Sequence, residues 1–478
     1  MEKGKRKFIG HLTLDGERQI QEVEQGGSYR YLGIAQVFAP ITLTTKYRLR
    51  RKFLGRLRAV WRSLLNAKQK AISTNTRATA VFQYYFGILQ WGTSELDRLD
   101  CTVCRTISRF HGHHRNASIL RLYITRMEGG RGLTSLQQVW EQSVASLYEN
   151  LIWQTEPWLR GVLLHQQWKH AQFKSSLIQE VYTVFHRHGL PLPGSEREST
   201  IERPTAARMV RASQQRVLIE TLRRKRIHGA HRHTLEAAEG RYDSTLWLRY
   251  GKSKAETEAL VFAAQDGVLH TNKYRRDVLR QDIDPACRLC HEGPETIGHI
   301  LSCCPHSLWK SIKLRHDRVL ATLIKHVGRA RGLEIPSTDA TSTTVEDTNT
   351  KLWVDLTIPT AEQITERRPD LVIHLKDEKV IWVVDVAVSW DPLVAERELE
   401  KTAKYRDLMA DLGRRYVGWN VQAIPVVIGS LGTVGGLRRF LLITGIFDSH
   451  NAERVVEEIQ QAALRGSAQM IRRQLSMR

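Results

Sequence analysis

Apolar positions in the first half of the chain recur at helical spacing. Residues 46–70 and 203–233 each place apolar side chains every three or four positions, which gathers them on one side of a helix. Residues 75–190 and 247–277 are also expected to be mainly helical, whereas residues 29–34 suit a hairpin. The apolar sides of the first two helices are Leu49, Phe53, Leu57, Trp61, Leu64 and Leu65, and Val210, Val217, Leu218 and Leu222.

Beyond residue 350 the pattern changes to β-strands. Residues 370–376 and 380–388 are runs rich in valine and isoleucine around a turn-like KDEK segment, which predicts a hairpin. A helix over residues 394–412 follows, and residues 421–428 form a further β-prone run. Polar stretches at 191–204 and 337–350 predict linkers, and the second is rich in serine and threonine and has no aromatic residue.

The charge balance indicates a polyanionic partner. The 478 residues carry 72 Lys+Arg against 50 Asp+Glu, a net charge of +22, and 41% are hydrophobic, so several domains can bury cores. No run approaches the roughly 20 apolar residues of a membrane span, and no apolar run follows the basic start of the chain. We therefore expect neither a membrane segment nor a secretory signal.

Two helical segments concentrate the positive charge. Residues 46–70 contain ten Lys/Arg and no acid, and residues 203–233 contain nine Lys/Arg and one acid, Glu220. Such helices favour phosphate binding, although a solvated helix face or a partner-binding helix would look the same. The candidate nucleic-acid-binding residues are Arg50, Arg51, Lys52, Arg56, Arg223, Arg224, Lys225 and Arg226.

Four of the six cysteines lie between residues 287 and 304, which favours a metal site over a disulfide framework. With Cys304 as the last ligand, the pattern C-x2-C-x8-H-x4-C has the ligand types and the close pair of a zinc knuckle. Cys303 could replace Cys304, His291 is a weaker alternative, and unligated buried thiols remain open. The predicted zinc ligands are Cys287, Cys290, His299 and Cys304. Cys101 and Cys104 lack a second ligand pair, so we expect a buried pair on a helix.

A carboxylate and lysine pattern follows the second linker. Asp385 interrupts an apolar strand, and a buried acid needs a cation or a hydrogen-bond donor. Asp370 begins the partner strand, so the two carboxylates could share a magnesium ion, and Lys401 or Lys404 could reach the phosphate. A strand acid paired with a helix lysine, without catalysis, fits the same spacing.

The order of these motifs resembles the carboxyl-terminal region of non-LTR retrotransposon proteins with a restriction-like endonuclease, closest to the Dong-like group. The segment at residues 29–34 is similar to a reverse-transcriptase primer grip, and GGRGL at 129–133 is similar to the connector after its thumb. Asp370, Asp385, and Lys401 with Lys404-Tyr405, match the PD…D…K pattern. The resemblance implies a nuclear protein that nicks chromosomal target DNA to prime reverse transcription of the element RNA.

No paired-aspartate polymerase motif precedes Tyr31, so the chain is not expected to synthesise DNA alone. The alternative function is a catalytically inactive DNA- or RNA-binding fragment. The expected fold is multidomain α/β, with a basic helical half, a zinc knuckle and a PD-(D/E)xK endonuclease domain whose mixed sheet is flanked by helices. The expected divisions are a palm remnant (1–45), a helical thumb and connector (46–190), a basic helical region (191–280), the knuckle and a helix (281–335), a flexible linker (336–350) and the endonuclease (351–478).

Overall fold

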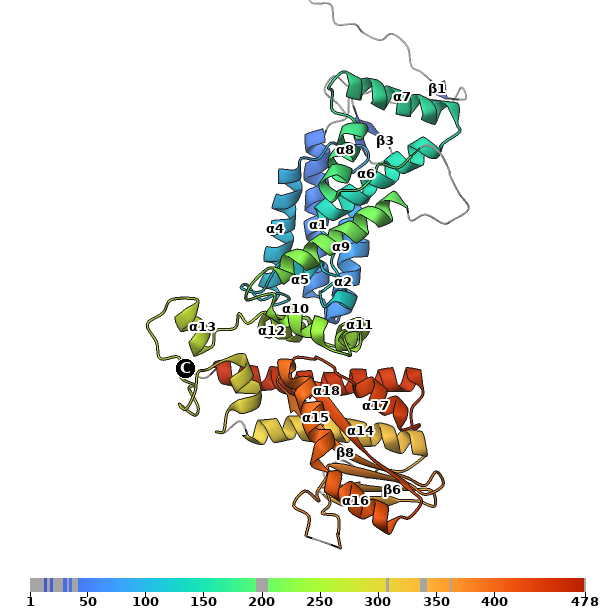
Figure 1. Cartoon of the computed structure of the whole chain (residues 1–478). Coiled ribbons are helices and arrows are strands. Elements are labelled where there is room, and N and C mark those ends of the chain that lie inside the picture. The colour runs from blue at the N-terminus through green and yellow to red at the C-terminus, as the bar shows by residue number, and fades with distance from the viewer. Residues whose placement is uncertain are drawn as a thin grey trace, which may run out of the picture.

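The computed structural model separates a helical half from a half built on a β-sheet (Figure 1). It describes residues 42–194, 205–306, 309–335, 342–361 and 363–476, and the backbone of four short strands within residues 13–36. The described chain is mostly helical and contains one five-stranded mixed sheet, as predicted. The predicted hairpin is confirmed, because β3 (Tyr29–Tyr31) and β4 (Ile34–Gln36) pair antiparallel, as do β1 (Thr13–Leu14) and β2 (Arg18–Gln19).

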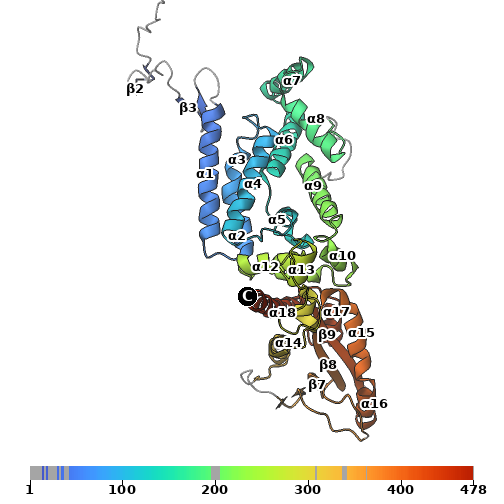
Figure 2. The same ribbon diagram turned by 90° about the vertical axis from the view of Figure 1, so that its left-hand side faces the viewer.

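The helical half packs around a single apolar core. Its largest buried side chains include Phe53, Trp61, Phe82 and Phe185, so helices far apart in the sequence share the same interior. Figure 2 shows α1 at one edge of this half and α9 toward the other. The helices are α1 (Thr42–Arg62), α2 (Ala67–Ser73), α3 (Ala80–Gln83), α4 (Thr93–Arg109), α5 (Leu120–Tyr123), α6 (Leu136–Trp153), α7 (Pro157–Ala171), α8 (Leu177–His188) and α9 (Ala206–Arg223).

The helix predicted over residues 46–70 is in fact two helices. Helix α1 ends at Arg62, and Asn66 begins α2 by accepting a hydrogen bond from the Gln69 amide at 2.9 Å. The predicted apolar side is therefore wrong at Leu64 and Leu65, which lie in the exposed turn. In α9, Val217 is exposed although Val210 and Leu222 are buried.

The expected buried pair of cysteines on α4 is also wrong in part. The Cys101 side chain is exposed, while Cys104 is half-buried with its Sγ 3.6 Å from the Tyr123 hydroxyl. The apolar stripe of α4 instead consists of Leu96, Leu99, Val103 and Ile107, which turns Cys101 toward solvent. The predicted linker at 191–204 lies mostly outside the described residues.

Four short helices join the two halves: α10 (Ala230–Ala237), α11 (Leu246–Tyr250), α12 (Ala255–Gln265) and α13 (Asn272–Asp277). Buried ion pairs hold this junction to the helical half. Arg121 Nε lies 3.0 Å from Asp266 Oδ1, and Arg126 Nη2 lies 2.6 Å from Glu258 Oε2. Because buried charges are stable only when paired, these contacts hold α12 against the helical half.

The sheet has the strand order β5-β6-β7-β8-β9. Its first three pairings are antiparallel and the last is parallel, since two helices cross over between β8 and β9. The elements are α14 (Trp309–Arg331), β5 (Thr343–Glu346), β6 (Thr350–Val354), β7 (Leu371–Leu375), β8 (Val380–Ser389), α15 (Val394–Lys404), α16 (Arg406–Arg415), β9 (Asn420–Gly429), α17 (Leu437–Ile443) and α18 (Ser449–Ser476).

Helices cover both faces of the sheet. Trp382, Val384 and Val386 of β8 join the core formed with α14 and α18, whereas Ile381 and Val383 join the core formed with α15 and α16. Because side chains alternate along a strand, Asp385 lies on the α15 face. This alternation brings the acid of β8 to the helix that carries the predicted lysines.

Three boundaries differ from the prediction. Strand β5 lies inside the predicted flexible linker of residues 336–350, because Thr343–Glu346 pair with β6 at the sheet edge. Helix α14, expected to belong with the knuckle, packs against α18 and β8 and so forms part of the sheet's helical layer. The helix predicted over residues 394–412 is interrupted at Tyr405, which separates α15 from α16.

Candidate functional site

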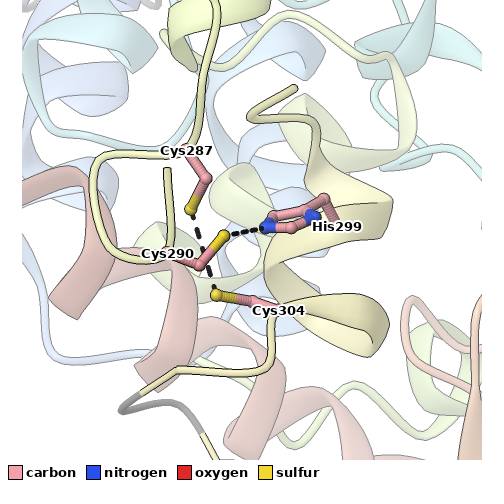
Figure 3. A group of neighbouring side chains, drawn as sticks. All are labelled: Cys287, Cys290, His299 and Cys304. Atoms are coloured by element: carbon pink, nitrogen blue, oxygen red, sulfur yellow. Dashed lines mark hydrogen bonds between the residues drawn. The ribbon is translucent and has the colours of Figure 1, made fainter. Parts of the chain in front are cut away.

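The Cys/His cluster is built from one short segment. An isolated bridge between Ala286 and Pro294 folds the chain back, and the Cys287 amide donates to the Gly293 carbonyl at 2.7 Å. The short helical turn η4 (His299–Cys303) follows, and its first amide is capped by the Thr296 hydroxyl at 3.0 Å. The two parts of the segment therefore present their side chains to a common point (Figure 3).

The four predicted ligands meet there. The ligand atoms of Cys287, Cys290, His299 and Cys304 all lie within 4.8 Å of one another. Cys287 Sγ lies 3.9 Å from Cys304 Sγ, and Cys290 Sγ lies 3.3 Å from His299 Nε2. Zinc–sulfur bonds of about 2.3 Å in a tetrahedron place the ligand atoms about 3.8 Å apart, and the Cys287–Cys304 separation of 3.9 Å is close to that spacing.

The structure also separates these four from the alternatives. Cys303 is exposed and, like His291, is not among the clustered ligands, whereas Cys304 is buried. Burial raises the pKa of the Cys304 thiol to about 12, and the neighbouring Cys287 adds to this rise. A bound dication would reverse that effect by stabilising the thiolates. The cluster could therefore hold a metal ion.

A buried carboxylate, Glu295, holds the segment that carries the cluster. Glu295 is fully buried and accepts hydrogen bonds from Arg288 Nη2 at 2.7 Å and from the backbone amide of Asn272 at 2.9 Å. Gln474 of α18 donates to the same carboxylate at 3.0 Å and lies 3.8 Å from Cys287 Sγ. The last turns of α18 thus fix the cluster segment against the sheet half.

The two predicted acids lie on neighbouring strands. Asp370 directly precedes β7, and the register that pairs Leu371 with Val384 places Asp370 opposite Asp385. The Asp385 side chain is only 5% exposed, and that of Asp370 is 20% exposed. The pair therefore opens toward solvent on the Asp370 side.

Both predicted lysines reach Asp385, but not equally. Lys401 forms an ion pair with Asp385 Oδ2, whereas Lys404 Nζ is 3.8 Å from Asp385 Oδ1 and also pairs with Glu366 at 3.5 Å. The Tyr405 hydroxyl donates to Asp385 Oδ1 at 2.8 Å and accepts from Lys404 Nζ at 2.9 Å. Lys401 is thus the closer of the two, and Tyr405 fixes the carboxylate.

His316 of α14 is a member of this site that the sequence did not reveal. Its Nε2 lies 3.3 Å from Asp370 Oδ2 and 3.2 Å from the Val386 carbonyl. Burial favours the neutral imidazole, but the hydrogen bonds and charges of Asp370 and Asp317 raise the pKa of His316 to about 9. No local spacing connects positions 316 and 370, so only the packing of α14 on the sheet brings them together.

The electrostatics of the two acids differ. Burial raises the pKa of Asp385, and the charge of Asp370 raises it further, while the two lysines act in the opposite direction. Burial also acts to raise the pKa of Asp370, but the hydrogen bond and charge of His316 outweigh it and the pKa is lowered. Two close carboxylates, one of them partly open, suit a divalent cation such as magnesium.

The predicted nucleic-acid-binding residues divide into two groups. Arg50, Arg51 and Lys52 are exposed on α1, and neither Arg51 nor Lys52 forms an ion pair with any described residue. Arg56 is exposed too, but its guanidinium donates to the Arg77 carbonyl at 2.7 Å. Arg48 lies beside Arg51 and Lys52 on the same surface and extends the predicted set.

The second basic group is partly neutralised. Arg224 pairs with Glu220 at 3.0 Å, and Arg223 lies 3.4 Å from Glu236. Lys225 and Arg226 are exposed beyond the end of α9 and form no ion pair with a described residue. The α1 surface is therefore the stronger candidate for a phosphate interface.

Comparison with known proteins gives one informative match. Over 153 residues, the chain is 28% identical to the "Retrovirus-related Pol polyprotein from type-1 retrotransposable element R2" of Popillia japonica. The match covers 30% of this chain and 29% of that protein. No protein-family model matches the chain. The predicted resemblance to non-LTR retrotransposon proteins is thereby confirmed, while the Dong-like assignment stays a prediction.

Among the described helices, none combines the length and the apolar composition that crossing a lipid bilayer would need.

Proposed function

We propose that this chain is the nucleic-acid-binding, DNA-cleaving part of a retrotransposon protein. Its sheet half is a restriction-like endonuclease of the PD-(D/E)xK type, and its targets are chromosomal DNA and, through the basic surfaces, the element RNA in the nucleus. The observation that carries the proposal is the meeting of Asp370, Asp385 and Lys401 at one point of the sheet. Structural ion pairs rarely place two acids side by side, since like charges repel.

Each residue of this site has a role in the proposed reaction. Asp370 and Asp385 would hold magnesium, which supplies an activated water and stabilises negative charge on the phosphate when bound. Lys401 lies beside Asp385 and can donate to a phosphate oxygen or orient the water. Tyr405 holds one oxygen of Asp385 in place, so that carboxylate keeps its orientation. Lys404 supports Tyr405 and is the secondary candidate.

The Cys/His cluster has a structural role in this proposal. Three cysteines and one histidine would supply the four ligands that a structural zinc ion takes, which would leave no open position for chemistry. Its support by Gln474 connects the cluster to α18 and thus to the sheet. Zinc would therefore stabilise the half of the chain that carries the acids.

A plasmid-nicking assay tests the proposal. The zinc-loaded chain is incubated with supercoiled plasmid with and without magnesium, beside Asp385→Asn and the control Asp377→Asn. Asp377 lies exposed in the turn between β7 and β8, so its substitution is matched in chemistry and remote from the site. We expect magnesium-dependent nicking that Asp385→Asn abolishes and Asp377→Asn keeps. Equal nicking by wild type and Asp385→Asn would refute the endonuclease.

A non-catalytic DNA- or RNA-binding module is the second candidate. Arg51 and Lys52 of α1 favour it, because they are exposed, form no ion pair with any described residue and need no chemistry to attract phosphates. It predicts binding whose affinity falls steeply with salt and no metal-dependent cleavage. Binding that is independent of salt would count against both candidates.

A further inference from the structure

Helix α14 connects the Cys/His cluster to the acidic site through two consecutive residues. Arg315 is 1% exposed, and its Nη2 donates to the Leu301 carbonyl of η4 at 2.8 Å and reaches the Val388 carbonyl of β8 at 3.4 Å. Its Nη1 donates to the Ser467 hydroxyl of α18 at 3.0 Å. These contacts fix this turn of α14 against the sheet, and the next residue is His316.

His316, Asp370 and Val386 form a closed hydrogen-bonded ring. His316 Nε2 contacts both Asp370 Oδ2 and the Val386 carbonyl, and the Val386 amide donates to the same Asp370 Oδ2 at 2.6 Å. Asp317 holds the other ring nitrogen of His316 at 3.2 Å. Oδ2 of Asp370 thus receives two donors, whereas Oδ1 accepts no hydrogen bond from any described residue.

We infer that His316 is a positioning residue, which orients the Asp370 carboxylate so that its Oδ1 is presented to a divalent cation. The inference rests on the proposed metal-dependent function of the acid pair. A carboxylate with one oxygen fixed cannot rotate, so less conformational freedom is lost when the cation binds. The backbone amide of Val386 alone would leave the carboxylate free to turn about that single bond.

A purely structural histidine on the same helix provides the matched control. His326 lies in α14 and its Nε2 is 3.0 Å from Glu458 Oε2 of α18. The His326 side chain is 7% exposed, whereas that of His316 is 27% exposed, and His326 contacts no residue of the acid pair. Loss of the His326 imidazole removes one histidine–carboxylate contact from α14. Loss of the His316 imidazole removes two, to Asp370 and to Asp317, and only His316 touches the acid pair.

A second effect of His316 opposes the first. A protonated imidazole beside Asp370 repels a cation, so its removal could tighten binding even while the carboxylate loses its orientation. Glutamine separates the two effects, because its amide donates a hydrogen bond from a similar position and carries no charge.

The experiment measures Mn2+ binding to the zinc-loaded chain by calorimetry, for wild type, His316→Leu, His316→Gln and His326→Leu, with Asp370→Asn as the reference without the site. Partners that orient a metal ligand typically change affinity by about 10- to 100-fold. We expect at least about tenfold weaker binding for His316→Leu, with most of this loss restored in His316→Gln. His326→Leu should bind like wild type and lose only thermal stability.

The other outcomes are equally decisive. Tighter binding by both His316 variants would show that His316 acts only as a competing charge and would overturn the positioning role. Unchanged binding by His316→Leu would overturn it as well. If the wild type binds Mn2+ but nicks no plasmid, the endonuclease is refuted. The Mn2+ affinities of the His316 variants would then still test the positioning role. Wild type without an Asp370-dependent Mn2+ site would refute both.

Discussion

The Cys/His cluster and the acidic site differ in how the chain assembles them. All four cluster residues come from positions 287–304, and the turn between them is closed by hydrogen bonds within the same segment. The acidic site combines the start of β7, the middle of β8, the end of α15 and one residue of α14. The first site depends on local folding and, in our proposal, on a metal ion, whereas the second depends on correct packing of both layers on the sheet.

The largest effect that we expect is a loss of zinc and of stability on substitution of Cys304, but not of its neighbour Cys303. Cys304→Ser removes one of four clustered ligands, so the chain should lose its zinc and a large part of its stability, because structural zinc contributes on the order of 10 kcal/mol in isolated fingers. Cys303→Ser changes an exposed neighbour and should keep both. Zinc content by atomic spectroscopy and thermal melting give the answer. Zinc loss in Cys303→Ser alone would reverse the assignment.

The next comparison concerns the two lysines of the acidic site. Lys401 contacts Asp385 directly, so Lys401→Met should lower the nicking rate by about 100-fold or more, as expected for loss of a charge that stabilises a transition state. Lys404→Met should lower it by roughly tenfold, because Lys404 acts on Asp385 mainly through Tyr405. Lys325→Met, on the exposed side of α14, is the control. A larger loss for Lys404→Met would exchange the two roles.

The stability of the acidic site should also depend on pH through His316. The pKa of His316 is raised from 6.5 to about 9, so its pairing with Asp370 stabilises the fold fully below pH 6.5 and loses that effect as the pH rises through about 9. Without magnesium, His316→Gln should therefore cost on the order of 2 kcal/mol of unfolding free energy at pH 6 and clearly less at pH 9.5. Chemical denaturation at both values checks this, and an equal cost would contradict the ion pair.

The smallest effect concerns the basic helices. Arg51→Gln with Lys52→Gln removes two exposed charges that form no ion pair within the described part of the chain, and should weaken DNA binding several-fold and lower the salt slope by about two. Arg224→Gln changes a residue already paired with Glu220 and should have less effect. Fluorescence anisotropy over a series of salt concentrations measures both. Equal slopes for wild type and the α1 variant would exclude this surface from phosphate contact.

The sequence predicted those parts whose cause is local. Helical periodicity located α1 and α9, runs rich in valine and isoleucine located β7 and β8, and ligand spacing located the cluster. The position of Asp385 on the α15 face also follows from its parity along β8.

The remaining features depend on tertiary contacts. Strand β5 is polar because it lies at the sheet edge, so composition alone made it resemble a linker. His316 lies 54 positions before Asp370 and has no spacing rule in common with it. The break at Tyr405 follows from the buried contact of its hydroxyl with Asp385, which helical periodicity does not contain.

The most direct test of the central claim is a magnesium titration of plasmid nicking with the zinc content held at one ion per chain. We predict that the wild-type nicking rate rises and saturates with magnesium, whereas Asp385→Asn stays at background and keeps its zinc and its plasmid binding. Nicking whose rate depends on the zinc content, but neither on magnesium nor on Asp385, would contradict the proposed endonuclease.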